Sequence, residues 1–220
     1  MTAVAVSAER AARDLADLDD AEFEVRLLAA TPTHEGRDPA RLRQWAAAAS
    51  AFGAALAPVP CTARVVESDG GLAAGLLARY TSRPPTVELY TDAIDAAEDL
   101  VDRLGWRHWY PPGSVRAAAV AHEAVHEQLH HGSAKAALRR SVGHVVLRLG
   151  DHRAYGHVAG ADEIAAHAYA RKSCGLGRNP LLLTAALAAA TRPWDRPPHP
   201  PQEIRLRRSA TQSLQHGREK

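Results

Sequence analysis

The segment that most constrains this chain is His122-Glu123-x-x-His126, which lies in a stretch of helix-forming residues. On an α-helix, side chains four residues apart project from the same face, one turn apart. His122 and His126 therefore point two imidazoles at one place, with a spacing that suits a small divalent cation. Glu123 leaves the helix on the neighbouring face, where its carboxylate can reach a water molecule bound to such an ion. The motif predicts a metal site with a base beside it.

Signals on both sides of the motif favour a helix. Ser114 can cap its N-terminus after Pro111-Pro112-Gly113, and Gly132 follows the last turn, where a helix often stops. The alternative interpretation is an alanine-rich helix with surface histidines and no metal. Apolar residues recur at steps that place them on one buried stripe of the helix: Val115, Ala118, Ala119, Val125 and Leu129.

Two imidazoles hold a metal ion poorly, so a third ligand must come from elsewhere. His130 shares the face of His122, but eight residues of helix rise about 12 Å. Because metal–nitrogen bonds are about 2.1 Å long, one ion cannot bind both. Glu163 is the preferred third ligand, since it begins a later helix that the chain is long enough to return beside the first. Asp162 and His167 are its substitutes.

Glu163, His167 and Arg171 follow one another at steps of four, so they form one stripe on the predicted helix. A polar stripe is often a solvated face, and that interpretation stays open. A carboxylate, an imidazole and a guanidinium together on an otherwise alanine-rich helix favour a functional role instead.

The sequence divides into three predicted parts. Residues 1–60 are expected to be a helical segment packed on the core, residues 61–191 the metal-binding core, and residues 192–220 a proline-rich, disordered tail. The tail has seven Lys/Arg against three Asp/Glu, a local charge of +4, whereas the whole chain carries +2. The remaining residues are therefore slightly acidic, at −2, and we do not expect nucleic-acid binding.

Within the core, patterning predicts a fold of the α+β class that is predominantly helical. The segment Gly150–Gly160 is expected to be a polar loop. Strands are expected to form a small antiparallel sheet directly before the motif helix, over Cys61–Glu67, Gly75–Tyr80 and Thr86–Tyr90. Further helices are expected from Thr91 to Gly105, through Leu138, Val142, Val145 and Leu149, over Asp162–Arg171, and from Asn179-Pro180 to about Ala190.

The two cysteines, Cys61 and Cys174, are not part of a CxxC pair, so neither a disulfide framework nor a thiolate zinc site is expected. No apolar run approaches the length of a membrane span. The first residues lack the basic region and long apolar core of a secretory signal. We therefore expect a cytoplasmic protein without a membrane partner.

The motif helix, the small sheet before it and the later helix with Glu163 resemble the zincin metallopeptidases that use a glutamate as third ligand. The resemblance covers roughly residues 61–175 and implies a zincin-like fold in which His122, His126 and Glu163 bind zinc. It further implies that Glu123 is the general base, and that the strand around Val87–Tyr90 is the edge along which an extended substrate lies.

Two residues depart from the family pattern. Glu127 puts a charge directly after the second histidine, where the family usually keeps an uncharged residue. His167 stands four residues after Glu163, where the thermolysin-like pattern has an aspartate. The chain is therefore more similar to small, divergent zincins than to thermolysin.

These observations lead us to expect a zinc-dependent hydrolase, specifically a metallopeptidase acting on a peptide or small amide. Zn²⁺ lowers the pKa of its bound water to about 7, and Glu123 would take the proton as that water attacks a carbonyl group. Candidate donors for the developing oxyanion are His157, Tyr155, His167 and Tyr169.

Two other functions fit the same residues. Two histidines and one carboxylate also describe non-haem Fe²⁺ sites, which would make the protein an oxygenase or tailoring enzyme. The third possibility is a non-catalytic binding or regulatory module that keeps the fold, with a metal that is absent or can be removed without loss of partner binding.

Overall fold

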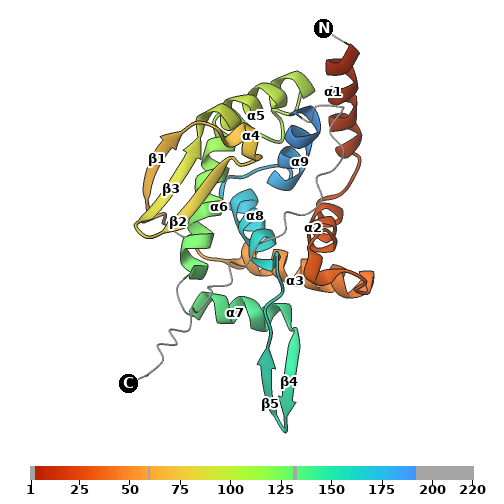
Figure 1. Cartoon of the computed structure of the whole chain (residues 1–220), viewed down its shortest axis with the longest axis vertical. Coiled ribbons are helices and arrows are strands. Elements are labelled where there is room, and N and C mark those ends of the chain that lie inside the picture. The colour runs from red at the N-terminus through yellow and green to blue at the C-terminus, as the bar shows by residue number, and fades with distance from the viewer. Residues whose placement is uncertain (1–2, 59, 131–132, 192–220) are drawn as a thin grey trace, which may run out of the picture.

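The structure, a computed structural model, describes residues 3–58, 60–130 and 133–191. It is a mixed arrangement that is mostly helical and includes two small sheets (Figure 1). The predicted tail, residues 192–220, lies outside the described residues. Within those residues, no helix combines the length and the apolar character that a membrane crossing requires.

The N-terminal part is helical, as predicted, and its helices begin where capping residues place them. Asp38 accepts a hydrogen bond from the N–H of Ala40 over 3.0 Å, and Pro39 occupies the first turn, where no N–H donor is needed. Asp19 caps the preceding helix in the same way. The elements are α1 (Ala3–Leu15), α2 (Asp20–Ala29), the 3₁₀ helix η1 (Pro32–His34) and α3 (Pro39–Ala55).

A three-stranded sheet follows, with the order β1-β3-β2, and the short helix α4 (Gly71–Ala74) lies between the first two strands in the sequence. β2 pairs antiparallel with β3, but β1 runs parallel to β3. The predicted all-antiparallel sheet is therefore wrong in one of its two pairings, because the chain crosses over before β2 and returns. The strands are β1 (Arg64–Ser68), β2 (Ala78–Ser82) and β3 (Pro85–Tyr90).

The strand order also corrects the predicted substrate edge. Val87–Tyr90 belongs to β3, which has a neighbour on each side and is the central strand. A central strand has no unpaired backbone edge to offer. The free edges of this sheet belong to β1 and β2.

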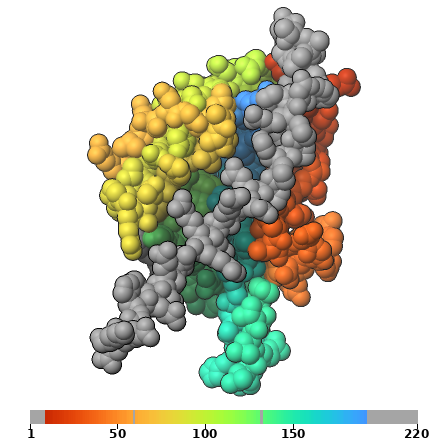
Figure 2. All heavy atoms as spheres, in the orientation of Figure 1, coloured from red at the N-terminus to blue at the C-terminus, as the bar shows by residue number. Residues whose placement is uncertain are grey.

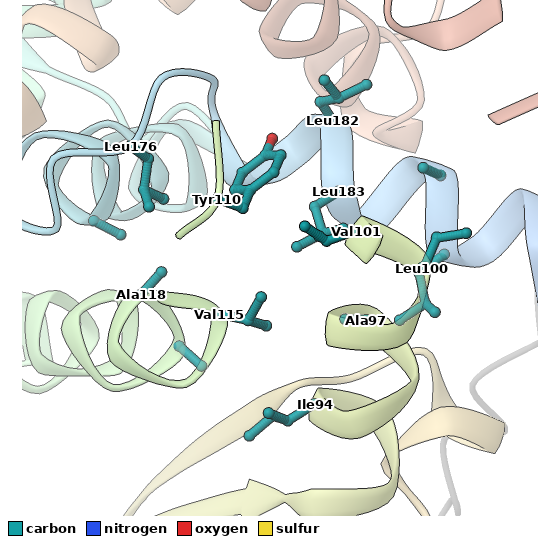
Figure 3. Close-up of a cluster of buried hydrophobic side chains, with 14 of the residues drawn as sticks. Ile94, Ala97, Leu100, Val101, Tyr110, Val115, Ala118, Leu176, Leu182 and Leu183 are labelled. Carbon is teal, nitrogen blue, oxygen red and sulfur yellow. The ribbon is translucent and has the colours of Figure 1, made fainter. Parts of the chain in front are cut away.

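One hydrophobic cluster joins helices α5 (Thr91–Leu104), α6 (Ser114–His130) and α9 (Pro180–Thr191). Figure 3 shows Val101 of α5 close to Leu183 of α9, and Val115 of α6 facing the same interior. Tyr110, from the turn before α6, donates a hydrogen bond to the carbonyl of Asn179 over 2.9 Å. These contacts fix the N-terminal half of α6, the helix that carries the motif.

The helix predicted through Leu149 is wrong beyond its first half. α7 (Ser133–Val142) ends at Gly143, whose φ of 73° is left-handed, and the chain then forms a hairpin of β4 (Val145–Leu149) and β5 (His152–Tyr155). The apolar spacing matched a helix, but this glycine and the valines after it favour a strand. The polar loop expected over residues 150–160 is accordingly wrong for β5. Figures 1 and 2 show the hairpin projecting from the rest of the molecule.

Helix α8 (Ala161–Ser173), which follows the hairpin, packs on both α3 and α6. Its approach to α3 is close: a Cβ at Gly53 would lie 2.0 Å from the carbonyl oxygen of Ala165. Only glycine leaves room for this backbone-to-backbone contact. The N-terminal helices therefore hold α8, which carries Glu163 and His167, at a fixed distance from the motif helix.

Candidate metal centre

Three side chains from two helices meet at one point. Nε2 of His126 lies 3.0 Å from Nε2 of His122, and both belong to α6. Oε2 of Glu163, from the first turn of α8, lies 3.3 Å from Nε2 of His122. Oε1 of the same carboxylate lies 3.2 Å from Nε2 of His126. The structure therefore brings together the three residues that the sequence predicts as metal ligands.

These separations suit a tetrahedrally coordinated ion. Two ligand atoms bonded to one such ion at 2.0–2.1 Å stand about 3.3 Å apart. The three donor pairs of His122, His126 and Glu163 are separated by 3.0, 3.2 and 3.3 Å. The side chain of Glu163 is 46% exposed, so the group is also reachable from solvent. Both imidazoles and the carboxylate can hold a divalent ion with little movement.

His167 offers a second way to complete the site. Its ring packs against that of His122, with 4.3 Å between the ring centroids. One donor atom each from His122, Glu163 and His167 lie within 4.8 Å of one another, so this group can also hold a metal ion. The set with His126 has donor separations of 3.0–3.3 Å. The Nδ1 atoms of His122 and His167 are both buried without a hydrogen-bond partner among the described residues.

The protonation of these groups follows from their contacts. Burial opposes ionisation of Glu163, but hydrogen bonds with His122 and His126 hold the pKa of its carboxyl well below its ordinary value of 4.5. Burial alone would lower the pKa of His126, yet the contact with Glu163 raises it above 6.5. Burial and the charge of His122 keep the pKa of His167 well below 6.5. A cation bound here would displace the proton that these groups share.

The donor atoms open into a cavity of about 570 Å³. Glu123 lines the cavity beside the two histidines and is itself 8% exposed. Its Oε2 accepts a hydrogen bond from the backbone N–H of Tyr80 over 2.9 Å. Tyr80 lies on β2, so the carboxylate predicted as the base is held against the free edge of the sheet. The cavity walls come from β2, α6, α7, α8 and the start of α9.

Comparison with family models, curated proteins and solved structures finds no match to this chain. What the site can do must therefore be argued from its own geometry.

The other predicted site residues fall into two groups. Asp162, His157 and His167 line the cavity. Tyr155, on β5 of the hairpin, and Tyr169, which is 6% exposed and packed in the core around α3 and α8, are not among the cavity-lining residues. Of the four candidate oxyanion donors, the two histidines are the ones that the structure places at the cavity.

Glu127, which departs from the zincin pattern, has a structural contact. It is 9% exposed, and its carboxylate accepts hydrogen bonds from the backbone N–H groups of Thr62 and Ala63 at 3.0 and 3.3 Å and from the Thr62 hydroxyl. These two residues precede β1. Glu127 therefore ties the start of the sheet to α6, and its charge is matched by donors away from the metal ligands.

Sequence reasoning missed the contribution of the Tyr80 backbone. The segment was expected to be a strand, but a strand pattern does not say which of its neighbours in space it will face. The contact follows from the position of β2 at the end of the sheet order, and that order depends on the crossover before β2, which no local sequence signal indicates.

Proposed function

We propose that this protein is a zinc-dependent hydrolase, most specifically a metallopeptidase similar to the zincins with a glutamate ligand. The observation that carries the proposal is the meeting of His122, His126 and Glu163 with mutual distances of 3.0–3.3 Å, next to the buried carboxylate of Glu123. Three protein ligands leave one position of a tetrahedral ion open, which is the pattern of catalytic rather than structural zinc sites.

A zinc ion held by these three residues would polarise the carbonyl group of the substrate and lower the pKa of a bound water. Glu123 accepts the proton of the attacking water and later delivers it to the leaving amine. The hydrogen bond from the Tyr80 N–H holds the carboxylate in place for both transfers. His157 and His167 both line the cavity, so either imidazole is a candidate to donate a hydrogen bond to the developing oxyanion.

The edge of β2 supports an extended substrate. The N–H of Tyr90 donates a hydrogen bond to the carbonyl of Leu77, so the backbone N–H and C=O groups of Leu77 point towards β3. In the antiparallel register, the backbone groups of Ala78 and Tyr80 then point away from β3. Ala78 and Tyr80 both line the cavity. A peptide in extended conformation can pair with the outward backbone groups of Ala78 and with the carbonyl of Tyr80, whose N–H is engaged by Glu123, and so cross the metal ligands. This is the edge role that the sequence had predicted for β3.

An iron oxygenase uses the same three ligands, so metal geometry alone does not separate the two proposals. Glu123 favours the hydrolase, because a carboxylate beside the metal ligands has a direct role as a base in hydrolysis. Elemental analysis of protein purified without oxygen decides this point. Stoichiometric iron with turnover that needs dioxygen contradicts the zinc hydrolase.

The proposal is tested with zinc-loaded full-length protein and a library of random synthetic peptides, whose cleavage is followed by mass spectrometry. We expect one zinc per chain and cleavage of internal peptide bonds. Glu123→Gln should keep its zinc, since an amide oxygen can still accept the Tyr80 N–H, and should lose on the order of a thousandfold in rate. Undiminished cleavage by this variant contradicts the mechanism.

A further inference from the structure

Two cations of α7 line the cavity, and neither has an ion-pair partner among the described residues. Lys135 and Arg139 stand one turn apart on this helix, and both line the cavity that holds the metal ligands. Within residues 3–58, 60–130 and 133–191, neither forms an ion pair. Nε of Arg139 is buried and has no hydrogen-bond partner in that part of the chain.

The positions of Lys135 and Arg139 destabilise the folded protein when no anion is bound. A buried N–H of a guanidinium without an acceptor carries the desolvation penalty of a charged group. Lys135 adds a second positive charge in the first turn of α7, where the helix dipole is already positive and where no acidic residue lies. An anion placed between the two side chains would relieve both effects, and it would form charge-assisted hydrogen bonds.

The third cation of the cavity wall differs from this pair. Arg79, on β2, is already engaged, since its guanidinium forms an ion pair with Glu88 of the neighbouring strand at 2.6 Å. Asp162 and Glu163 also line the cavity from α8, but neither lies within ion-pair distance of Lys135 or Arg139. The positive charge at α7 is therefore available to a ligand.

The opposite end of the cavity is apolar. Val115 and Ala118, in the first half of α6, line it together with Leu176 and Leu183, and Figure 3 shows these four side chains in the same hydrophobic cluster. From Val115 to His122 the helix rises about 10 Å, and α7 follows directly after its other end. The metal ligands thus lie between an apolar wall and the part of α7 that presents Lys135 and Arg139 beside Leu138 and Val142.

We infer that Lys135 and Arg139 bind a carboxylate of the substrate, so that the enzyme prefers peptides with an acidic group on one side of the cleaved bond. The inference rests on the proposed peptidase function and names its substrate class. The carboxylate has two possible sources, the side chain of an Asp or Glu residue and the C-terminus of the peptide. The two cations are specificity-determining residues and take no part in the proton transfers of Glu123.

The test uses zinc-loaded full-length protein and two random peptide libraries, one with free and one with amidated C-termini. In both libraries we expect Asp and Glu to be enriched at one position relative to the cleaved bond if a side chain is bound. Preference for the free C-terminus, with cleavage at a constant distance from it, identifies the terminal carboxylate instead. Either result supports the inference.

The variants make the assignment specific. Lys135→Ala/Arg139→Ala should lower kcat/KM for acidic peptides by about tenfold, mainly because KM rises. The kcat/KM for neutral peptides should stay within about twofold of its value in the unchanged protein. Lys135→Glu/Arg139→Glu should reverse the preference towards Lys and Arg. Arg140→Glu is the matched control, because Arg140 is exposed on the same helix and is not a cavity-lining residue. Arg140→Glu should keep the peptide preference and the kcat/KM values of the unchanged protein.

The outcomes separate the two proposals. Cleavage without any preference for a carboxylate, or a preference that survives both double substitutions, overturns this inference and leaves the peptidase function intact. Absence of cleavage by the zinc-loaded, unchanged protein overturns the peptidase function and this inference with it. Unaltered thermal unfolding of the α7 variants shows that a changed preference does not come from a damaged fold.

Discussion

Oε1 of Glu163 lies 3.2 Å from Nε2 of His126, although α7 and the β4–β5 hairpin separate their helices in the sequence. Loss of this carboxylate should therefore weaken metal binding strongly. We expect Glu163→Gln to lower zinc affinity by more than about 100-fold, because substitution of outer-shell partners already costs 10–100-fold. Competition with a chromophoric chelator measures the affinity.

Asp162→Asn is the matched control for Glu163→Gln. Asp162 is the neighbouring acid, it also lines the cavity, and it forms no ion pair with His122 or His126 among the described residues. The zinc affinity of the Asp162→Asn variant should stay within about threefold of that of the unchanged protein, as expected for a residue outside the ligand set. If Asp162→Asn loses zinc and Glu163→Gln retains it, the third ligand is Asp162.

The two possible ligand sets predict different effects at His126 and His167. Nε2 of His126 lies 3.0 Å from His122 and 3.2 Å from Glu163, which suits a direct ligand, so His126→Ala should lower zinc affinity by more than about 100-fold. His167 packs on His122 and then acts by orienting that ring, so His167→Ala should cost about 10–100-fold. The reverse order of the two losses would show that His167 is a ligand.

The sequence predicts much of the local structure because local signals were strong. Gly105 ends α5 with a φ of 74°, and Asn179-Pro180 precedes α9, as expected. The approach of Glu163 to His122 was also expected, because a third ligand had to come from a helix that could return beside α6. These features depend on capping, on helix periodicity and on the chemistry of metal ligands.

What the sequence did not predict depends on contacts between distant segments. Val145 and Leu149 continue the apolar spacing of α7, but Gly143 ends that helix and the hairpin begins. The parallel pairing of β1 with β3 depends on a crossover that no local pattern encodes. The edge position of β2, and with it the Tyr80 contact to Glu123, follows from that crossover.

Gly53 provides a test of how α8 is positioned. Helix propensity alone predicts that Gly53→Ala stabilises α3 by about 1 kcal/mol. The added Cβ, however, would stand 2.0 Å from the carbonyl oxygen of Ala165, so the two helices must move apart. We expect the steric effect to outweigh the gain in helix propensity, with a net loss of about 2 kcal/mol in the free energy of unfolding, measured with urea. Zinc affinity should fall too, because α8 carries Glu163.

Ala51→Ser is the control for Gly53→Ala, since Ala51 is exposed on the same helix. It should change stability by less than about 0.5 kcal/mol and leave zinc affinity unchanged. A stabilised Gly53→Ala protein would contradict the close packing of α3 on α8. A destabilised variant with unchanged zinc affinity would instead show that the metal ligands do not depend on this contact.

Glu24 predicts a pH dependence of stability that is separate from the metal centre. It is 4% exposed, and its Oε1 accepts hydrogen bonds from Ser50 Oγ at 2.8 Å and Asn179 Nδ2 at 3.2 Å. Burial is the main cause that raises the pKa of this carboxyl from 4.5 to about 6. Between pH 4.5 and about pH 6, Glu24 binds a proton more fully in the folded protein than in the unfolded chain, so the free energy of unfolding falls as pH rises. The loss amounts to about 2 kcal/mol by pH 7.5.

Glu24→Gln should remove this dependence, because the amide keeps an oxygen that can accept both hydrogen bonds and never ionises. Urea unfolding at pH 4.5 and pH 7.5 measures the effect. The difference in unfolding free energy between variant and unchanged protein should rise by about 2 kcal/mol, in favour of the variant, from the lower pH to the higher. Glu35→Gln, at an exposed carboxyl, should show no such change. A constant difference for Glu24→Gln across this range would mean that Glu24 stays ionised in the folded protein.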